Sequence, residues 1–186
     1  MTTLLRTPRL TLRTLAESDA ESLYVLHNDP AVMRFLNGGR PIAREVVVRE
    51  TLPSFVAAGF LAAVERATGD FLGWFHLRAP RGGPPDEPEL GYRLRTSAWG
   101  RGYATEGSLA LIDRAFADLG ARRVFARTMT VNLASRRVMD KCGLRFVRTF
   151  FEDWPEVIEG SEQGDVEYEI LRETWAASRA EPRGRS

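Results

Sequence analysis

The sequence predicts a single α/β domain with a mixed, mostly antiparallel sheet flanked by helices. Strand-like segments joined by hairpin turns dominate the first half of the chain, whereas strands and helices alternate in the second half. The length agrees, because 186 residues with 44% hydrophobic content suit one domain with its own core. We expect the domain to take in residues 1–186, with an ordered core over about 7–175 and a frayed polar tail over 176–186.

Period-2 alternation of apolar side chains marks the early strands, and apolar spacings of three and four mark the helices. The first half predicts a strand over 9–13, a helix over about 18–28, a short helix ending near 37–39, a helix over 42–58, and a hairpin of strands over 60–65 and 71–77. Asp29 and Pro30 separate the first two helices. Pro53 should kink or divide the third, because proline lacks a backbone donor.

The second half begins after a loop over 79–88, which carries two Gly and four Pro. Its expected elements are a strand over 89–94, a helix over 103–119, a strand over 124–129, a short helix over 134–141, a strand over 144–151, an acidic loop over about 152–164 and a strand over 166–171. Gly120 and Gly143 stand where helix C-caps are needed. This order predicts strand–helix–strand units that place parallel strands in the sheet.

Charge and cysteine content exclude several classes of protein. The 26 basic residues, 25 of them Arg, balance 25 acidic ones, so no uncompensated basic surface for nucleic acid is expected. Cys142 is the only cysteine and is expected to be buried and structural, and His27 and His76 lie far apart, so neither a disulfide nor a zinc site is predicted. With no signal-like or membrane-spanning run, we expect a cytoplasmic protein with no membrane partner.

Gly100 and Gly102 form a loop that opens directly into the helix at 103–119. Such a loop presents unpaired N–H groups at a positive helix end, which suits a phosphate or pyrophosphate, and Arg101 would add its charge. An ordinary strand-to-helix turn is an equally good interpretation of the glycines alone. The loop lacks the third glycine of a dinucleotide-binding fingerprint, which argues against a dinucleotide-binding domain. The chain also has neither the Gly-Lys-Ser/Thr motif of P-loop NTPases nor the Gly-x-Ser-x-Gly elbow of the common serine hydrolases, so these two classes are not predicted.

Several motifs occur together in one order along the chain. They are residues 7–13 (TPRLTLR), 91–94 (GYRL), 99–106 (WGRGYATE), Asn132 with Ser135, 141–143 (KCG) and 168–175 (YEILRETW). In this order and spacing the chain resembles the GNAT superfamily of acyl-CoA-dependent N-acetyltransferases. The closest resemblance is to the branch that includes the bacterial ribosomal-protein N-terminal alanine acetyltransferases.

The resemblance implies acetyl-CoA as the acyl donor, held in a cleft where the strands at 89–94 and 124–130 splay apart. Its pyrophosphate would sit on the N–H groups of residues 101–105, and its pantetheine arm would pair with the backbone near 92–95. Asn132 would bond the pantetheine or acetyl region, although Asn also suits a helix N-cap. The implied cofactor-binding residues are Tyr92, Arg93, Leu94, Arg95, Gly100, Arg101, Gly102, Tyr103, Ala104, Thr105, Asn132, Ser135 and Arg136.

The implied reaction is direct attack of a neutral amine on the thioester. Glu89 is the expected base, acting directly or through water, against the alternative of an exposed charge. A backbone N–H near 92–94 would meet the oxyanion. Many members of the family carry a Tyr seven residues after the Asn, where this chain has Met139. Ser135 is therefore the hydroxyl expected to protonate or orient the thiol of the departing coenzyme A. The alternative for Ser135 is a hydroxyl at the helix start that is bonded to the backbone. No metal is implied.

The sequence leaves the acceptor open between a protein N-terminal α-amine and a small-molecule amine. A peptide acceptor predicts an acidic groove, for which the candidates are Asp86, Glu87, Glu152, Asp153 and Glu156. His76 could face the acceptor. A non-catalytic acyl-CoA-binding module is the alternative function, given Met139 in place of Tyr, and a homodimer is left open.

Overall fold

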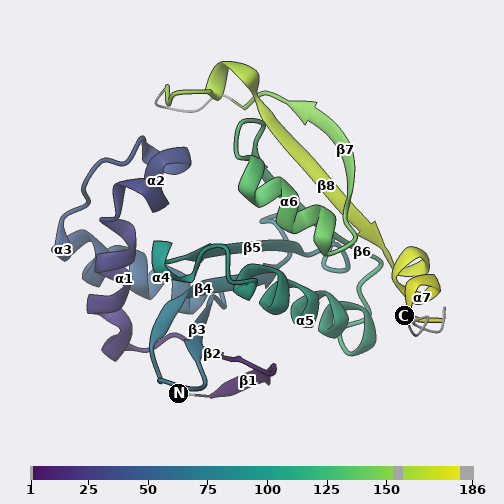
Figure 1. Ribbon diagram of the computed structural model, residues 1–186, viewed down its shortest axis with the longest axis horizontal. Helices are drawn as coiled ribbons and strands as arrows, with labels where there is room; N and C mark the ends of the chain where they lie inside the picture. The colour runs from purple at the N-terminus through teal and green to yellow at the C-terminus, as the bar shows by residue number, and fades with distance from the viewer. Residues whose placement is uncertain (1, 153–156, 181–186) are drawn as a thin grey trace.

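The sheet carries eight strands in the order β1-β2-β3-β4-β5-β6-β8-β7, and only β5 and β6 run parallel. The computed structural model in Figure 1 describes residues 2–152 and 157–180. The strands are β1 (Thr3–Arg6), β2 (Leu10–Thr14), β3 (Leu61–Glu65), β4 (Phe71–Arg78), β5 (Glu89–Leu94), β6 (Arg123–Met129), β7 (Arg145–Phe150) and β8 (Asp165–Leu171). The predicted fold class is confirmed. Only β1 was not predicted, because this edge strand is largely exposed on both faces and so shows no buried alternation.

Seven helices and a few single turns connect these strands in the described residues. The helices are α1 (Ala20–His27), α2 (Pro30–Asn37), α3 (Arg44–Val46), α4 (Leu52–Ala57), α5 (Tyr103–Ala117), α6 (Leu133–Lys141) and α7 (Arg172–Ala180), and the turns are η1 (Glu17–Asp19), η2 (Val47–Thr51), η3 (Thr96–Ala98) and η4 (Ser161–Gln163). The predicted division near Pro53 is confirmed, because η2 is a wide π turn directly before α4. A proline that lacks its N–H favours such a local widening of the helix.

Asp29 does more than end the first helix. Its carboxylate accepts hydrogen bonds from the N–H groups of Ala31 and Val32, so it caps α2 with Pro30 as the first helical residue. Thr96, which follows β5, donates to the same carboxylate at 3.1 Å. This contact fixes the start of α2 beside the end of β5.

The chain beyond residue 175 continues as helix, where a frayed tail was expected. Trp175 anchors α7: its Nε1 donates to Asp113 at 2.8 Å, and its ring lies 5.3 Å from that of Phe116, centroid to centroid. The helix therefore reaches Ala180, and residues 181–186 lie outside the described part of the chain.

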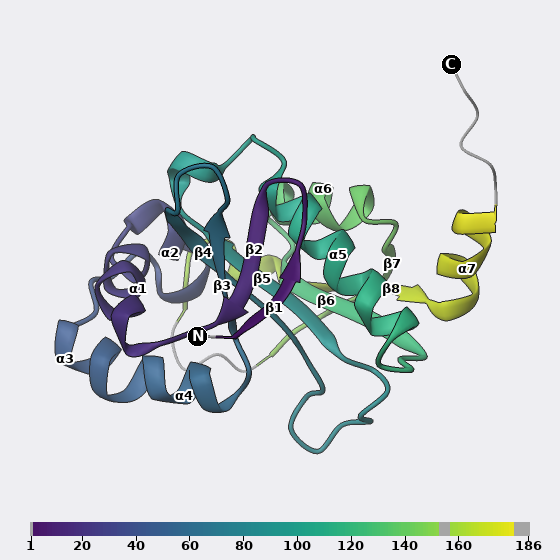
Figure 2. The same cartoon turned by 90° about the horizontal axis from the view of Figure 1, so that it is seen from below.

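Two hydrophobic clusters lie on opposite faces of the sheet. One packs α5 and α6 against the strands and contains Phe75, and the other packs α1, α2, η2 and α4 against them and contains Trp74. Figures 1 and 2 show the blue α3 and α4 well apart from the green α5 and α6, with strands between them. Gly107 allows α5 to sit tightly, because an added Cβ would lie 2.4 Å from the Phe75 ring. Adjacent residues of β4 and β5 thus point their side chains to opposite faces of the sheet.

Candidate functional site

The parallel strands β5 and β6 separate almost as soon as they meet. They share one registered pair, Glu89 with Phe125, supported by a hydrogen bond from the Phe125 N–H to the Pro88 carbonyl at 3.2 Å. Beyond that pair the strands diverge, although β5 stays fully paired with β4 and β6 with β8. The edge of β5 over residues 90–94 therefore faces an opening in the sheet, as the resemblance implied.

Two helix N-termini border the open end, because α5 follows β5 and α6 follows β6. Gly100 and Gly102 take φ values of +70° and +82°, and Gly102 is the N-cap of α5. A Cβ on Gly100 would meet nothing within 4 Å, so the loop surface is open. No described residue accepts a hydrogen bond from the N–H groups of Tyr103, Ala104 and Thr105. This geometry fits a diphosphate.

The loop before α5 is clamped to the start of β2 by Glu106. One carboxylate oxygen accepts from the Thr7 hydroxyl at 2.6 Å and from the Arg9 N–H at 2.8 Å, and the other accepts from Arg9 Nε at 2.7 Å. Arg9 Nη1 also donates to the Arg101 carbonyl at 2.8 Å. Although burial acts in the opposite direction, these hydrogen bonds lower the pKa of Glu106. Residues far apart in the sequence thus hold one anion-binding loop in shape.

Glu106→Gln is expected to destabilise the fold by about 1.5–3 kcal/mol at pH 7, since hydrogen bonds to a charged group contribute that much. A carboxyl with a lowered folded-state pKa stabilises above its ordinary pKa, and that contribution is lost as pH falls through the folded value. The variant should therefore approach wild type in acid. Chemical denaturation at pH 7 and below pH 4 checks this. Glu21→Gln, which removes an exposed pair with Arg44, should change stability by less than about 0.5 kcal/mol; equal losses would contradict the clamp.

The two arginines expected near phosphate differ in how firmly they are held. The Arg101 side chain is half-exposed. Its Cζ lies 5.0 Å from the Tyr103 ring centroid, and its Nη2 lies 3.4 Å from a Glu65 carboxylate oxygen. This loose arrangement leaves the guanidinium able to turn toward a phosphate bound at the loop. Arg136 donates from Nε to the Tyr168 hydroxyl at 3.1 Å and from Nη1 to the Thr130 carbonyl at 3.0 Å. A phosphate contact from Arg136 stays a prediction and would use its remaining nitrogen.

Asn132 and Ser135 sit where α6 begins. The Asn132 amide oxygen accepts from the Ser135 N–H at 3.2 Å, and its nitrogen donates to the Thr128 hydroxyl at 3.1 Å. The N-cap role of Asn132 is therefore present, and a role toward pantetheine stays a prediction. The Ser135 hydroxyl lies 3.0 Å from the Tyr92 hydroxyl, so its partner is a side chain and not the backbone.

Tyr92 reaches from β5 to α6, and its hydroxyl also donates to the Ser135 carbonyl at 3.2 Å. Burial raises the pKa of Tyr92, so it stays a neutral phenol at physiological pH. Met139, at the position where many relatives carry Tyr, is buried in the core. The phenol at this opening therefore comes from the strand β5 and not from α6, which the sequence alone did not predict. Of the neighbouring predicted residues, Leu94 is buried, and Arg95 donates its backbone N–H to Leu72.

Glu89, Gly91 and Arg93 lie on the face of β5 opposite to the one that carries the Tyr92 side chain. Burial raises the pKa of the Glu89 carboxyl, and the charges of Arg127 and Arg78 offset part of the rise. The alternative of an ordinary exposed charge does not hold, because this side chain is partly buried at the last registered pair before the strands part. Its position suits a base, and that role stays a prediction.

The histidines and the cysteine are all buried. His76 packs on Gly91, where an added Cβ would lie 2.1 Å from its Nε2, and burial lowers its pKa to about 4. Its Nδ1 has no hydrogen-bond partner in the described structure. His27 accepts at Nε2 from Trp74 at 3.4 Å. Burial raises the pKa of Cys142 to about 12, so its thiol is not activated as a nucleophile.

The acidic residues considered for a peptide groove are mostly paired. Asp86 and Glu87 hold Arg122, Glu87 also holds Arg123, and Glu152 lies 3.8 Å from Arg127. Asp153 and Glu156 lie outside the described residues. A surface whose carboxylates already hold guanidinium groups attracts a free amine less strongly.

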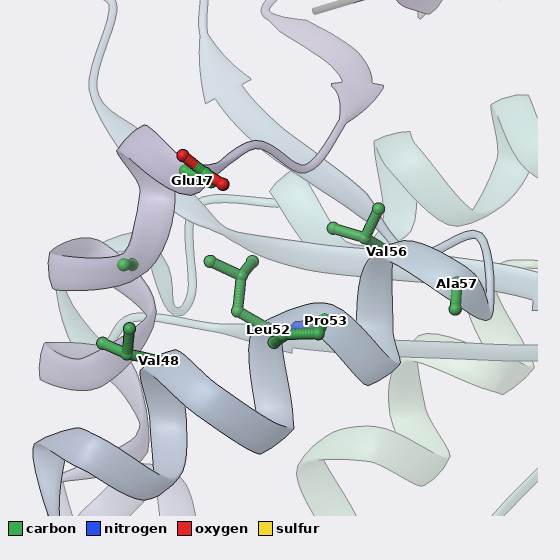
Figure 3. A pocket seen from close by; sticks show the side chains of 7 residues that line it. Glu17, Val48, Leu52, Pro53, Val56 and Ala57 are labelled. Atoms are coloured by element: carbon green, nitrogen blue, oxygen red, sulfur yellow. The ribbon is translucent and has the colours of Figure 1, made fainter.

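A separate apolar pocket lies between α1 and α4 (Figure 3). Its lining residues are Glu17, Ala20, Val48, Leu52, Pro53, Val56 and Ala57. None of them belongs to the opening between β5 and β6. No cluster of His, Cys, Asp or Glu in residues 2–152 and 157–180 could hold a metal ion. Those residues also contain no helix long and apolar enough to cross a membrane.

Comparison with known proteins identifies a matching family model, a similar curated protein and similar solved structures. A family model described as acetyltransferase (GNAT) domain matches residues 9–145. FsC-acetyl coenzyme A-N(2)-transacetylase of Aspergillus fumigatus is 38% identical over 181 residues, which cover 92% of this chain and 77% of the relative. A GNAT-family acetyltransferase structure from Bacillus anthracis superposes with a TM-score of 0.77 at 22% identity, covering 91% of this chain and 98% of that one.

The aminoglycoside acetyltransferase AAC(6')-Ib in complex with coenzyme A superposes with a TM-score of 0.73 at 19% identity, covering 92% of this chain and 99% of that one. At these identities the two structures are similar in fold alone. The region that matches the family model runs from Arg9, just before β2, to Arg145, the first residue of β7. It therefore includes the whole opening between β5 and β6.

Proposed function

The chain belongs to the GNAT acetyltransferase family, and on that premise we propose that it transfers the acetyl group of acetyl-CoA to the primary amine of a small molecule. It is an N-acetyltransferase that uses acetyl-CoA. The observation that carries the proposal is the opening between β5 and β6, with N–H groups at the start of α5 that no described residue accepts from on one side and the partly buried carboxyl of Glu89 on the other.

Two observations favour a small acceptor over a protein N-terminus. The relative that is 38% identical is named as an N(2)-transacetylase that uses acetyl coenzyme A. The carboxylates considered for a peptide groove, Asp86, Glu87 and Glu152, are already held by arginines. A binding module without catalysis is not favoured, because that relative is a transferase.

In the proposed reaction the diphosphate of the donor lies on the N–H groups of residues 101–105, and the pantetheine follows the open edge of β5. Glu89 removes a proton from the acceptor ammonium, directly or through one water, and the neutral amine then attacks the thioester carbonyl. The raised pKa of Glu89 brings its basicity closer to neutrality. A backbone N–H near 92–94 stabilises the oxyanion. The Ser135 and Tyr92 hydroxyls, 3.0 Å apart, orient the departing sulfur.

Ser135→Ala is expected to slow acetyl transfer by roughly 3- to 10-fold without weakening acetyl-CoA binding. The effect should be modest, since a thiol of pKa near 8.5 leaves readily and needs little acid assistance. Tyr92→Phe should give a loss of similar size, because it removes the other member of the pair. Steady-state rates and calorimetric affinity check this. An unchanged rate for both variants would remove the hydroxyl pair from the mechanism.

The proposed function is tested by thiol release from acetyl-CoA with a panel of acceptors. The panel holds small primary amines, aminoglycosides and peptides that begin with Ala or Ser. Amine-dependent release with the small amines supports the proposal. Transfer to the peptides alone would instead place the chain in the ribosomal-protein branch, and acetyl-CoA binding with no release on any amine would indicate a binding module.

A further inference from the structure

Arg93 is a partly covered cation with no counter-ion among the described residues. Its guanidinium lies over the Trp74 ring, 4.9 Å from the centroid, and its Nη1 lies 3.1 Å from His27 Nε2 and 3.3 Å from Met33 Sδ. Among the described residues, no carboxylate pairs with it, and neither its Nε nor its Nη2 has a hydrogen-bond partner. One edge of the guanidinium is therefore available.

The neighbours of Arg93 do not neutralise its charge. Burial, together with the charge of Arg93, lowers the pKa of His27 to about 3, so this histidine is neutral and accepts hydrogen bonds. Burial lowers the pKa of Arg93 only to about 10, so the guanidinium stays charged at pH 7. By contrast, Arg13 and Arg123, whose side chains are 17% and 19% exposed, both hold carboxylates. Arg93 is covered without that compensation, which favours an anionic ligand.

The side chain lies on the face from which an acceptor would approach. Along β5, Leu90 and Leu94 pack with α5 and α6, on the side where the diphosphate loop begins its helix. On the opposite face of the sheet, Arg93 lies beside its cross-strand neighbour Trp74 and contacts α1 and α2. Glu89, four residues earlier on β5, faces the same side as Arg93. A donor bound from one face leaves the other face for the amine.

We propose that the available edge of the Arg93 guanidinium binds a carboxylate of the acceptor, so that the substrate is an amine that also carries a carboxylate. The inference rests on the proposed acetyl transfer. A planar carboxylate matches the two donors of that edge, and the apolar partners of the guanidinium strengthen the pair. Glu89 and Arg93 lie four residues apart on one strand, about 13 Å between Cα atoms. The amine and the carboxylate of the substrate are therefore separated by several bonds.

Matched pairs of acceptors test this proposal. Each ω-amino acid of three to six carbons is compared with the alkylamine that lacks its carboxylate, and kcat/KM is measured for both. The wild type should prefer the carboxylated member by about 10-fold or more at the best chain length. Arg93→Gln should reduce that ratio to near one, whatever its effect on the absolute rates. Arg93→Lys, which keeps a charge but not the planar pair of donors, should give an intermediate ratio.

Arg34→Gln is the matched control, because it removes an exposed arginine from α2 next to Met33 and should leave the ratio unchanged. Equal rates on both members of every pair in wild type would overturn the proposal and leave acetyl transfer intact, and so would a preference that survives in both Arg93 variants. If no amine is acetylated, the proposed function itself fails. The wild-type ratio and the Lys variant keep the test decisive even where the Gln variant is unstable.

Discussion

Gly102→Glu is expected to weaken acetyl-CoA binding by at least about 100-fold. Gly102 has a φ of +82°, which an L residue adopts only at a cost of about 1–2 kcal/mol. The new carboxylate would also stand at the N-terminus of α5, where no described residue accepts from the N–H groups of residues 103–105 and where the diphosphate is expected. Strain and repulsion act together at one site. Calorimetric titration with acetyl-CoA measures the change.

Gly120→Glu is the matched control for that variant. Gly120 has a φ of +70° and open space around it, so it imposes similar backbone strain, but it lies just beyond the C-terminal end of α5. Its acetyl-CoA affinity should stay within a few-fold of wild type. If Gly102→Glu retained full affinity in a folded protein, the donor would have to bind elsewhere.

Glu89→Gln should lower kcat/KM by about 100-fold or more, the usual contribution of a positioned base. The carboxyl must be ionised to accept the amine proton, so the wild-type rate should fall as pH falls through its raised pKa. That acidic limb should lie above the usual range for a glutamate and should be absent from the variant. A pH profile of kcat/KM on one amine tests both points, and an unchanged rate would assign the proton to water alone.

The folding stability of Glu89→Gln shows whether a lower rate comes from the loss of the base or from damage to the fold. Because the pKa of Glu89 is raised in the folded protein, its contribution to stability is present below its ordinary pKa and is lost as pH rises through the folded value. At pH 7 the ionised side chain therefore costs stability, and Glu89→Gln should be at least as stable as wild type. A clear loss of stability would point to a structural role.

Periodicity and turn residues predicted most of the fold. The strand over 89–94 and the elements that follow it as far as β8 were placed to within a few residues, because regular apolar spacing and capping glycines mark them. The break near Pro53 followed from its missing donor. The strand β1 and the helix α7 were not predicted, since β1 is largely exposed and α7 depends on the contact of Trp175 with Asp113.

The site was harder to predict, because it depends on which face each side chain takes. The glycine loop stands out in the local sequence and Glu89 was named through the family resemblance, and the roles of both stay predictions, whereas Tyr92 and Arg93 were expected only as backbone contacts to the donor. Alternation along β5 places them on opposite faces, yet their partners Ser135 and His27 lie 43 and 66 residues away. Such distant pairings carry no local signal, and only the folded chain brings them together.

The most direct test of direct acetyl transfer uses acetyl-CoA labelled in its acetyl group and a reactive amine from the acceptor panel. Mass spectrometry of the small-molecule product and of the intact protein then locates the label. We predict that the label lies on the amine nitrogen and that the protein, including the buried Cys142, carries none. Label held covalently by the protein, or an amine that stays unlabelled while acetyl-CoA binds, would contradict direct transfer from acetyl-CoA to the amine.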